Sequence, residues 1–557
     1  MRARSKHHAW ARWCAYIYQV THGLGHACSR CDTCKRGILV GNSMHHLNHL
    51  CDTRLPRLAW CAVLRENDDR VFVHHGPWIE VAESSFVEGA WSGCYSEMGF
   101  AHAITFTGSG ALLTPDGVLF ATPTHSVEPL YLLRANKTLY CSNSLRLILS
   151  SSHDDIDCGY LYYDLDITSM AFGLKRSISQ IPTRNRNWVN MHYYCNFTIC
   201  RDLSINVLGK PKIDPFAGYS DYISFLSGQV LSTMKNSGDA RRSVRYTPLS
   251  TISSGYDSAA TSVIAKKAGC KVFITFATSQ DGANDSGKLI GRILGLEATE
   301  FDPGAYCSRD DLPEAEFVAT GGGGGSVIYA GLEGRLQGKI LLTGNYGGEA
   351  WERANNRGGV DMVTWDSAGA DMFYFRTRVG FLHLAVPSIG YSQYASLQTI
   401  SNSEEMRSWT LNRAYDRPIP RRIVEDAGVG RELFGQTKRA AARSLKYCNP
   451  VSISEPDLRQ VMAATSYLNF CKFTEQRRLY ASHVERLIFA LFHKLYCFNA
   501  RVIRSKKLRA LAGRVGIALP AAPWIPIRFR KRRTRHRLLF HWGMEQIKRQ
   551  HIAHKAL

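Results

Sequence analysis

The chain has 557 residues, which is too long for one ordinary core and favours roughly two to four domains. Apolar residues make up 45% of the sequence, so most of it should fold, and a low-complexity repeat protein is excluded. The net charge of +22 lies at the two ends, because residues 501–557 carry +15 and residues 1–60 carry +7. Residues 61–500 are neutral, so binding to a polyanion or a membrane surface would concern the ends alone.

The cysteine content and the first residues bear on the compartment. Sixteen cysteines are many, but no apolar run of signal-peptide length follows the first charged residues, which favours a reducing cytoplasm with mostly unpaired thiols. The most apolar helix candidate, residues 484–498, contains Glu485, Arg486, His493 and Lys494 and is too short and too charged to span a bilayer. We therefore expect a cytoplasmic protein.

Residues 60–205 consist of short β-type runs separated by turn sequences. Asp116-Gly117 and residues 135–137 stand between such runs, as hairpin turns would. We therefore expect a sheet-rich region before residue 215.

From residue 221 the apolar period becomes helical, with Ile223, Leu226 and Val230 on one face. The expected elements that follow are a strand at 246–252, a helix whose stripe Ala260, Val263, Ile264 and Ala268 ends at Gly269, a strand at 271–278, a helix whose stripe Leu289, Ile290, Ile293 and Leu294 ends at Gly295, and a strand at 339–344. This alternation predicts an α/β fold with a doubly wound parallel sheet. Ligands bind beyond the carboxyl ends of such strands, where the turns at 253–258 and 343–349 fall.

The first of these turns, S-S-G-Y-D-S, carries groups that suit phosphate. Its backbone N–H groups and its serine hydroxyls can donate to an anion where a helix begins. Asp257 would repel phosphate unless a cation lay between them, so it indicates Mg²⁺. The lysine of the familiar P-loop is missing. The alternative is a plain strand-to-helix turn with a Ser or Asp N-cap.

This turn resembles the S-G-G-x-D-S signature of the PP-loop ATP pyrophosphatases. The turn T-G-N-Y-G-G-E at residues 343–349 resembles the S-G-x-G-x-D-E turn of asparagine synthetases, and residues 284–302 and 416–441 resemble the segments between and after these motifs. Residues 128–149 resemble the end of that family's glutaminase domain. The resemblance covers residues 60–450 and extends to the β-lactam synthetases.

The resemblance implies an organisation and a set of site residues. It implies a degenerate Ntn-hydrolase-like α+β sandwich at 59–215 and an adenine nucleotide alpha hydrolase-like domain at 216–500. It implies ATP and Mg²⁺ as cofactors. The metal ligands would be Asp257 and Glu349, and the nucleotide would lie against Ser253, Ser254, Gly255, Asp257, Ser258, Thr275, Phe276 and Gly344. Lys438 stands where the family has a lysine near the phosphates, although a solvated helical lysine is the alternative.

The sequence departs from the family at two places. The glutaminase nucleophile is an N-terminal Cys freed by removal of Met1, but residue 2 is Arg2, so the sheet-rich domain should be a scaffold, as in the β-lactam synthetases. In the second turn, aligned without a gap, Asn345 and Gly348 replace acids of the family. A one-residue slip instead matches the Tyr-Gly-x-Asp pattern of β-lactam synthetases and makes Tyr346 a catalytic candidate. Both alignments keep Glu349.

Three further groups have two interpretations each. Residues 1–58 form a basic Cys/His-rich extension that we expect to be poorly ordered, although zinc or an iron–sulfur cluster on Cys28, Cys31 and Cys34 is the alternative. The basic tail at 501–557 is either a solvated segment or a weak contact for nucleic acid or anionic lipid, with Trp524, Phe529, Phe540 and Trp542 beside it. Arg376, Arg378 and His383 lie either at the surface or in an acceptor pocket.

These observations predict an ATP-dependent amide-forming ligase without its own glutaminase. A small-molecule or peptide carboxylate would be adenylated with release of pyrophosphate, and ammonia or an amine would then displace AMP. A homodimer is a further expectation. One alternative is a PP-loop enzyme that modifies an RNA base, guided by the basic tail. The other is a catalytically inactive binding protein that has kept the fold.

Overall fold

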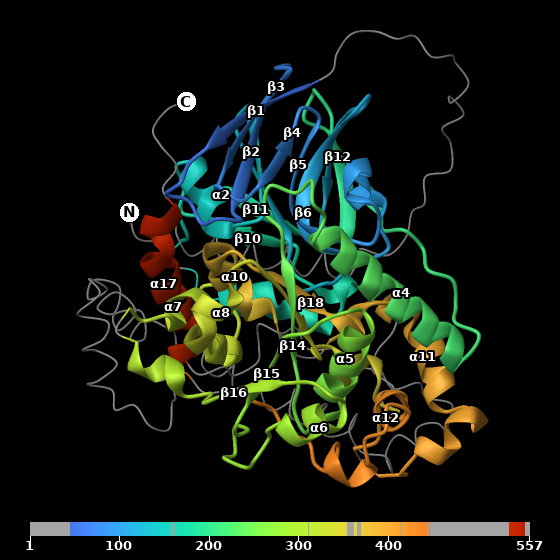
Figure 1. The fold of residues 1–557 in the computed structure, drawn as a ribbon. Helices are drawn as coiled ribbons and strands as arrows, with labels where there is room; N and C mark the ends of the chain where they lie inside the picture. Colours follow the sequence, from blue (N-terminus) through green and yellow to red (C-terminus); the bar gives the residue numbers. More distant parts are fainter. Residues whose placement is uncertain are drawn as a thin grey trace, which may run out of the picture. The chain divides into compact units, whose positions relative to one another are not determined.

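The computed structural model describes residues 45–157, 160, 162–309, 311–353, 361–364, 369–413, 415–442, 445 and 534–551. They form a mixed α/β structure with two sheets in the N-terminal region and a parallel sheet among helices (Figure 1). The predicted sheet-rich region is therefore confirmed.

The N-terminal region contains two sheets that share a core. The order of the first sheet is β1 (His46–Cys51), β3 (Arg70–His75), β2 (Trp60–Arg65), β9 (Thr138–Ser142), β8 (Leu130–Ala135), β11 (Trp188–His192) and β10 (Gln180–Pro182). The order of the second sheet is β13 (Ile205–Gly209), β12 (Cys195–Ile199), β7 (Gly117–Ala121), β6 (Phe106–Thr114), β5 (Ser85–Trp91) and β4 (Glu80–Ala82). Trp60 of the first sheet packs on Phe86 and Phe120 of the second. The two sheets are thus joined by aromatic packing.

Both predicted hairpin turns are confirmed. Thr114 pairs with Gly117 across the turn between β6 and β7. Ala135 pairs with Thr138 between β8 and β9, and Asn136 takes a left-handed backbone with φ of +52°.

Strand β1 lies within the range 1–58 that the sequence assigns to an extension. It pairs in parallel with β3, from His46 opposite Arg70 to Cys51 opposite His75. Its sequence, H-L-N-H-L-C, lacks the β-branched residues that mark a strand, and its side chains are half-buried or exposed at the edge of the sheet. The described structure therefore begins at residue 45, and of the range 1–58 residues 1–44 lie outside it.

The parallel sheet has the order β16 (Ala298–Phe301), β15 (Phe273–Phe276), β14 (Thr247–Thr251), β17 (Lys339–Thr343) and β18 (Leu382–Ala385). All of its pairings are parallel, as predicted. The chain runs outward from β14 through β15 to β16 and then returns to the other side of β14 with β17. The strand order therefore reverses between β14 and β17, at the place where α/β sheets bind ligands.

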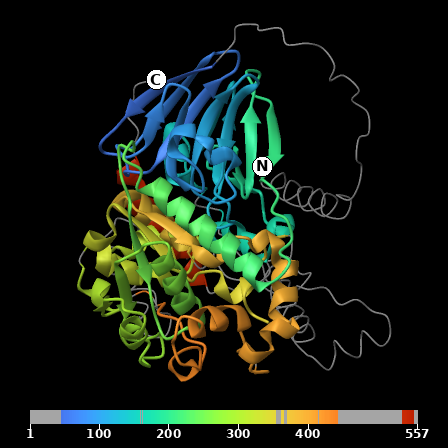
Figure 2. The same ribbon diagram turned by 45° about the vertical axis from the view of Figure 1, so that its right-hand side comes forward.

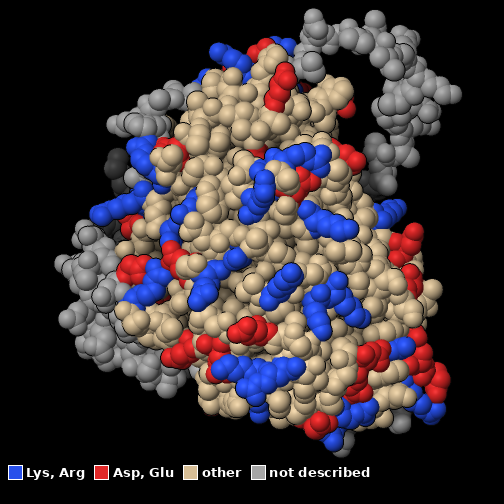
Figure 3. Space-filling view, viewed as in Figure 1, with Lys and Arg blue, Asp and Glu red and all other residues tan. Residues whose placement is uncertain are grey.

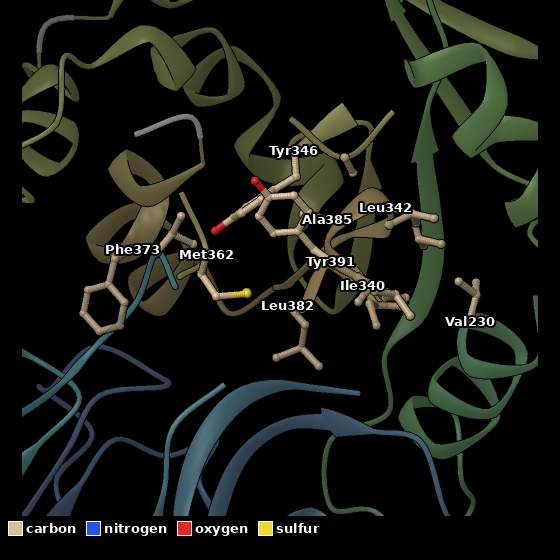
Figure 4. Close-up of a cluster of buried hydrophobic side chains, with 14 of the residues drawn as sticks. Val230, Ile340, Leu342, Tyr346, Met362, Phe373, Leu382, Ala385 and Tyr391 are labelled. Atoms are coloured by element: carbon tan, nitrogen blue, oxygen red, sulfur yellow. The ribbon is translucent and has the colours of Figure 1, made fainter. Parts of the chain in front are cut away.

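Helices cover both faces of the parallel sheet. On one face, Ile340 and Leu342 of β17 share a hydrophobic cluster with Val263 and Ile264 of α5 (Tyr256–Lys267). On the other face, Leu341 packs with residues of α7 (Glu314–Val318), α8 (Glu333–Leu336) and α10 (Phe373–Val379). Successive residues of β17 thus pack into hydrophobic clusters on opposite faces of the sheet, which explains why this strand has a continuous apolar sequence. Figure 4 shows the first of these clusters, with Leu382 of β18 beside Ile340.

One of the remaining helices does not bury all four residues of the apolar stripe that the sequence predicts for it. These helices are α2 (Leu145–Ser151), α3 (Tyr163–Ile167), α4 (Tyr219–Ser237), α6 (Lys288–Ile293), α9 (Gly347–Ala350), α11 (Tyr394–Ser401) and α12 (Pro418–Glu425). Helix α4 contacts both β5 and β14, and Figure 2 shows it running between the two regions. In α6, Ile290 and Leu294 are buried, but Leu289 and Ile293 are exposed, because only one side of this short helix meets the sheet. The predicted four-residue stripe is wrong for those two residues.

The C-terminal segment corrects another expectation. Helix α17 (Thr534–Gln546) packs against α7 and α3, and its Phe540 and Trp542 are buried. The ring of Phe540 stacks on Tyr163 at 5.3 Å between centroids. These two aromatic side chains therefore belong to the core and do not face a nucleic acid or lipid. Residues 501–533, Trp524 and Phe529 among them, lie outside the described residues.

The described residues have mixed surface charges, free thiols and no helix of membrane-spanning character. Basic and acidic side chains are interspersed on the face shown in Figure 3. The cysteines that the structure describes are free thiols, and among those residues no group of three or more His, Cys, Asp or Glu side chains is placed to hold a metal ion. Within the same residues, no helix combines the length and apolar character needed to cross a bilayer. The helix candidate at 484–498 and Cys28, Cys31 and Cys34 lie outside the described residues.

Candidate functional site

A cavity of about 500 Å³ lies at the carboxyl ends of β14 and β17, where the strand order reverses. Residues of the two turns that the sequence singles out line this cavity. Of the predicted site residues, the cavity is lined by Ser253, Gly255, Asp257, Ser258, Phe276, Gly344, Tyr346, Glu349 and Lys438. Segments that lie far apart in the sequence are thus brought to one place.

The first turn leads into α5 with its N-terminus open. The helix N-cap is Gly255, and no side chain caps the first N–H groups of the helix. The hydroxyls of Ser253 and Ser258 lie 2.5 Å apart and hydrogen-bond to each other, and the amide of Gly255 donates to Ser253 Oγ at 3.1 Å. The alternative of a side-chain-capped turn is therefore not what the fold contains. Uncapped N–H groups and the helix dipole favour an anion at this position.

Asp257 stands at the centre of the site. Its Oδ2 atom forms an ion pair with Arg417, whose side chain is 2% exposed. Its Oδ1 atom is buried and has no hydrogen-bond partner among the described residues. A buried carboxylate oxygen without a partner is costly, so this atom is suited to a ligand.

The second turn packs directly on Asp257. A Cβ atom on Gly347 would lie 2.5 Å from Asp257 Oδ1, and one on Gly344 would lie 2.6 Å from the Asp257 carbonyl carbon. Only glycine fits at these two positions. Gly348, which replaces an acid of the family in the ungapped alignment, has Arg417 Nη2 at 3.1 Å from the position of a Cβ.

Tyr346 and Glu349 follow in the same turn. Tyr346 has φ of +71°, a left-handed backbone that is strained for a tyrosine and is typical of functional turns. It is buried beside Tyr391, as Figure 4 shows, and its hydroxyl lies 3.5 Å from Ser126 Oγ. Glu349 lies on α9, is half-buried and lines the cavity. Burial raises the pKa of Tyr391, and the charge of Glu349 raises it further.

Two basic residues, Lys438 and Arg439, line the cavity. Lys438 Nζ lies 4.0 Å from the position that a Cβ on Gly348 would occupy, next to Arg417. Arg439 also lines the cavity and donates to the carbonyl oxygen of Asn284. Lys438 is therefore a cavity residue and not a remote helical lysine.

Two predicted residues do not line the cavity. Ser254 turns away and donates its hydroxyl to Asp285 Oδ1 at 2.6 Å. Thr275 accepts a hydrogen bond from the amide of Gly287 at 2.8 Å and is buried. Both side chains hold the segment 285–287 against the first turn. Asp285 itself lines the cavity, and burial raises its pKa.

Sequence reasoning did not single out Arg417, Asp285 or Asp371. Arg417 is the residue before Pro418 at the start of α12, and its partner Asp257 lies 160 positions earlier. No local pattern reveals such a pair. Asp371 lines the cavity together with Ser326, whose amide donates to Asp371 Oδ2 at 3.0 Å.

The surface interpretation is wrong for Arg376 and His383, which are buried, whereas Arg378 is half-buried, and none of the three lines the cavity. The Arg376 side chain is buried and pairs with Glu88 at 3.0 Å and Glu128 at 2.5 Å. Arg378 pairs with Glu316 and Glu333.

His383 is buried beneath the cavity wall, with Nε2 at 2.8 Å from Thr343 Oγ1. Burial lowers the pKa of His383 to about 3. These three side chains support the fold and do not line the cavity.

Two cysteines lie near the start of the sheet-rich region. Cys61 lies in β2, is fully buried, and burial raises its pKa to about 12. A thiol that is not ionised at neutral pH is a poor nucleophile. Cys51, at the end of β1, is exposed. The expectation of a scaffold without glutaminase chemistry stays a prediction.

Comparisons with known proteins assign neither a family nor a function to the chain. A scan against protein-family models and a search of curated proteins each find no match for the chain. The functional interpretation therefore stands on the cavity, on the residues that line it and on the motifs of the sequence.

Proposed function

We propose that the protein is an ATP-dependent, amide-forming ligase of the asparagine synthetase-like type. The observation that carries this proposal is the convergence of the two glycine-containing turns on Asp257, at the point where the strand order of a parallel sheet reverses. A cavity of about 500 Å³ has the size of a nucleotide site. The proposal assigns the parallel sheet to the PP-loop class and the sheet-rich region to a degenerate Ntn-hydrolase-like scaffold.

In the proposed site, the first turn binds the phosphates of ATP. The uncapped N-terminus of α5 and the hydroxyls of Ser253 and Ser258 supply donors for the pyrophosphate of ATP. Lys438 and Arg439 also line the cavity. Lys438 would stabilise the negative charge that develops on the leaving pyrophosphate.

The residues present fit a magnesium ion. Asp257 Oδ1 is a buried oxygen without a partner, and Glu349 contributes a second carboxylate to the same cavity. Oxygen ligands of this kind are the ones Mg²⁺ takes together with the phosphates of a substrate. When bound, the ion would neutralise phosphate charge during attack at the α-phosphorus.

Polar residues that the nucleotide and the metal do not use would contact the acceptor. They are Asn345, Asp371 and Ser326, which line the cavity with Gly323 and Gly325. A carboxylate and an amide among them suit a substrate that carries an amine as well as the carboxylate to be activated. The substrate carboxylate would attack the α-phosphorus and release pyrophosphate, and nitrogen attack on the acyl carbon would then release AMP. Tyr346, in its strained turn, is the second catalytic candidate beside Lys438.

Release of pyrophosphate from Mg·ATP tests this function. Purified full-length protein would be incubated with Mg·ATP, ammonium and a panel of amino-acid and peptide carboxylates. We expect pyrophosphate and AMP in equal amounts only with an accepted carboxylate. Release that depends on RNA and on no carboxylate would favour the base-modifying alternative. No release together with no binding of Mg·ATP would favour the inactive binding protein.

A further inference from the structure

Two histidines in the sheet-rich region share one hydrogen-bond pattern. His49 of β1 and His75 of β3 lie with their ring centroids 5.8 Å apart. His49 Nε2 is 3.2 Å from the carbonyl oxygen of Ala82, and His75 Nδ1 is 2.8 Å from the carbonyl oxygen of Gly76. A carbonyl oxygen only accepts, so each of these nitrogens carries the proton, and the other nitrogen of each neutral ring has a free lone pair.

The two nitrogens with free lone pairs are buried. They are His49 Nδ1 and His75 Nε2, and neither has a hydrogen-bond partner among the described residues. The His75 side chain is only 4% exposed. Burial lowers the pKa of both histidines, so both rings are neutral at pH 7 and able to act as ligands. Because a buried nitrogen without a partner is costly, a group that accepts electron density from both atoms would stabilise this arrangement.

The separation of the two rings suits one shared metal ion. With a Zn–N bond of about 2.0 Å, two imidazoles that bind the same zinc ion have centroids about 5–6 Å apart. A backbone carbonyl that accepts from the far nitrogen of the ring is also the usual arrangement behind a metal-bound histidine, because it fixes the tautomer. The alternative occupant is a water molecule that donates one hydrogen to each nitrogen.

A third donor lies next to the two histidines. Cys51 comes two residues after His49 on β1, so both side chains leave the same face of the sheet, and the register places Cys51 opposite His75. In the described part of the chain, no three His, Cys, Asp or Glu side chains already surround one point, so the exposed Cys51 thiol would have to rotate toward the histidines. A thiol within reach favours a metal over a water, since thiolate and imidazole together are typical zinc ligands.

We propose that His49, His75 and Cys51 form a binding site for one Zn²⁺ ion, with solvent at the fourth position. None of the three lines the candidate cavity, so the site does not depend on the proposed function. The ion joins the edge strand β1 to its neighbour β3. Because these ligands come together only in the folded chain, zinc binding adds to the free energy of unfolding.

Competition with a chromophoric chelator measures zinc binding to the full-length chain. Serine replaces the three cysteines of residues 28–34 in this parent chain, so that they do not compete for the ion. His49→Gln and His75→Asn each keep an amide N–H for the backbone carbonyl and remove the free lone pair. We expect each to bind the ion tenfold or more weakly than the parent. His74→Gln is the matched control, because His74 lies on the opposite face of β3, and it should bind zinc as the parent does.

Co²⁺ absorption spectra report the third ligand. The Co²⁺-loaded parent should show thiolate charge-transfer absorption, which Cys51→Ser should lose, and this substitution is at an exposed position that should leave the fold unchanged. Equal zinc affinities of the parent and both histidine variants would overturn the proposal and leave a bridging water as the occupant. Should both histidine variants fail to fold, Cys51→Ser still decides the question. Thiolate absorption that is missing from the parent, or undiminished in Cys51→Ser, would show that the proposed site is wrong.

Discussion

The proposed metal ligand can be tested by replacing Asp257 with asparagine, which removes one charge and keeps the shape of the side chain. The variant loses the anionic oxygen for the ion and turns an amide toward Arg417. We expect the affinity for Mg·AMPCPP to fall by tenfold or more, about 1.4 kcal/mol. Breaking a buried ion pair costs about 3–5 kcal/mol. Because the Asp257 side chain is 18% exposed, we expect a smaller loss in the free energy of unfolding, on the order of 1–3 kcal/mol.

Isothermal calorimetry with Mg·AMPCPP and urea unfolding would measure the two effects separately. Asp285→Asn is the matched control, because Asp285 lines the same cavity but binds Ser254. An asparagine can keep that hydrogen bond, so its nucleotide affinity should change by less than about threefold. Equal affinities of the wild type and Asp257→Asn would refute the metal site. Equal losses in both variants would show that a general disturbance of the cavity, and not ligation by Asp257, lowers the affinity.

Three further changes test the turn, the junction between the regions, and the buried histidines. Gly347→Ala places a methyl group 2.5 Å from Asp257 Oδ1, so it should lower both nucleotide affinity, measured by calorimetry, and the free energy of unfolding, the latter by about 1–3 kcal/mol. Arg376→Met leaves two buried glutamates unpaired and should cost about 3–5 kcal/mol in urea unfolding. Stability should also fall as the pH drops below 6.5, because unfolded His383 takes up a proton that the folded residue, with its pKa of about 3, does not. This residue alone accounts for up to about 1.4 kcal/mol per pH unit, and His383→Gln should reduce the slope by that amount.

Matched controls show which outcomes would contradict these three expectations. Gly334→Ala, where a Cβ meets no atom within 4 Å, should not lower the free energy of unfolding, and a loss equal to that of Gly347→Ala would remove the steric argument. Arg407→Met breaks a pair whose side chains are each 79% exposed, and it should change stability by less than about 0.5 kcal/mol. An Arg376→Met variant as stable as this control would mean that the buried pairs contribute nothing. An unchanged pH slope in His383→Gln would show that other groups cause the acid sensitivity.

Much of the parallel sheet could be predicted because its signals are local. The apolar run of residues 339–344, the helical stripe of α5 and the glycine after it each depend on neighbours in the sequence, and all three were found in place. Strands β16 and β18 were not predicted. Their sequences, A-T-E-F and L-H-L-A, each include polar or charged residues, whereas the equally short β15 lies within the apolar run 271–278. They became recognisable only by their pairing with β15 and β17.

In the candidate site, too, the sequence predicted features that depend on neighbouring residues and missed contacts between distant segments. The sequence predicted both turns, since their serines, glycines and acids are contiguous. It could not predict that Arg417 would pair with Asp257, or that Ser254 would turn to Asp285, because these contacts depend on how separate segments pack. The predicted role of Phe540 and Trp542 failed for a related reason. An aromatic residue beside a basic run has the same local sequence whether it faces a ligand or, as here, the core against α7.

Buried contacts tie the sheet-rich region to the walls of the cavity. Tyr346 of the second turn lies against Ser126, and the carbonyl of His383, under the cavity wall, accepts a hydrogen bond from Thr107 at 2.5 Å. Arg376 joins α10 to buried glutamates of the N-terminal region. Loss of the sheet-rich region would therefore remove the support of the strained tyrosine, and under the proposed function this support is by itself a reason for the chain to keep both regions.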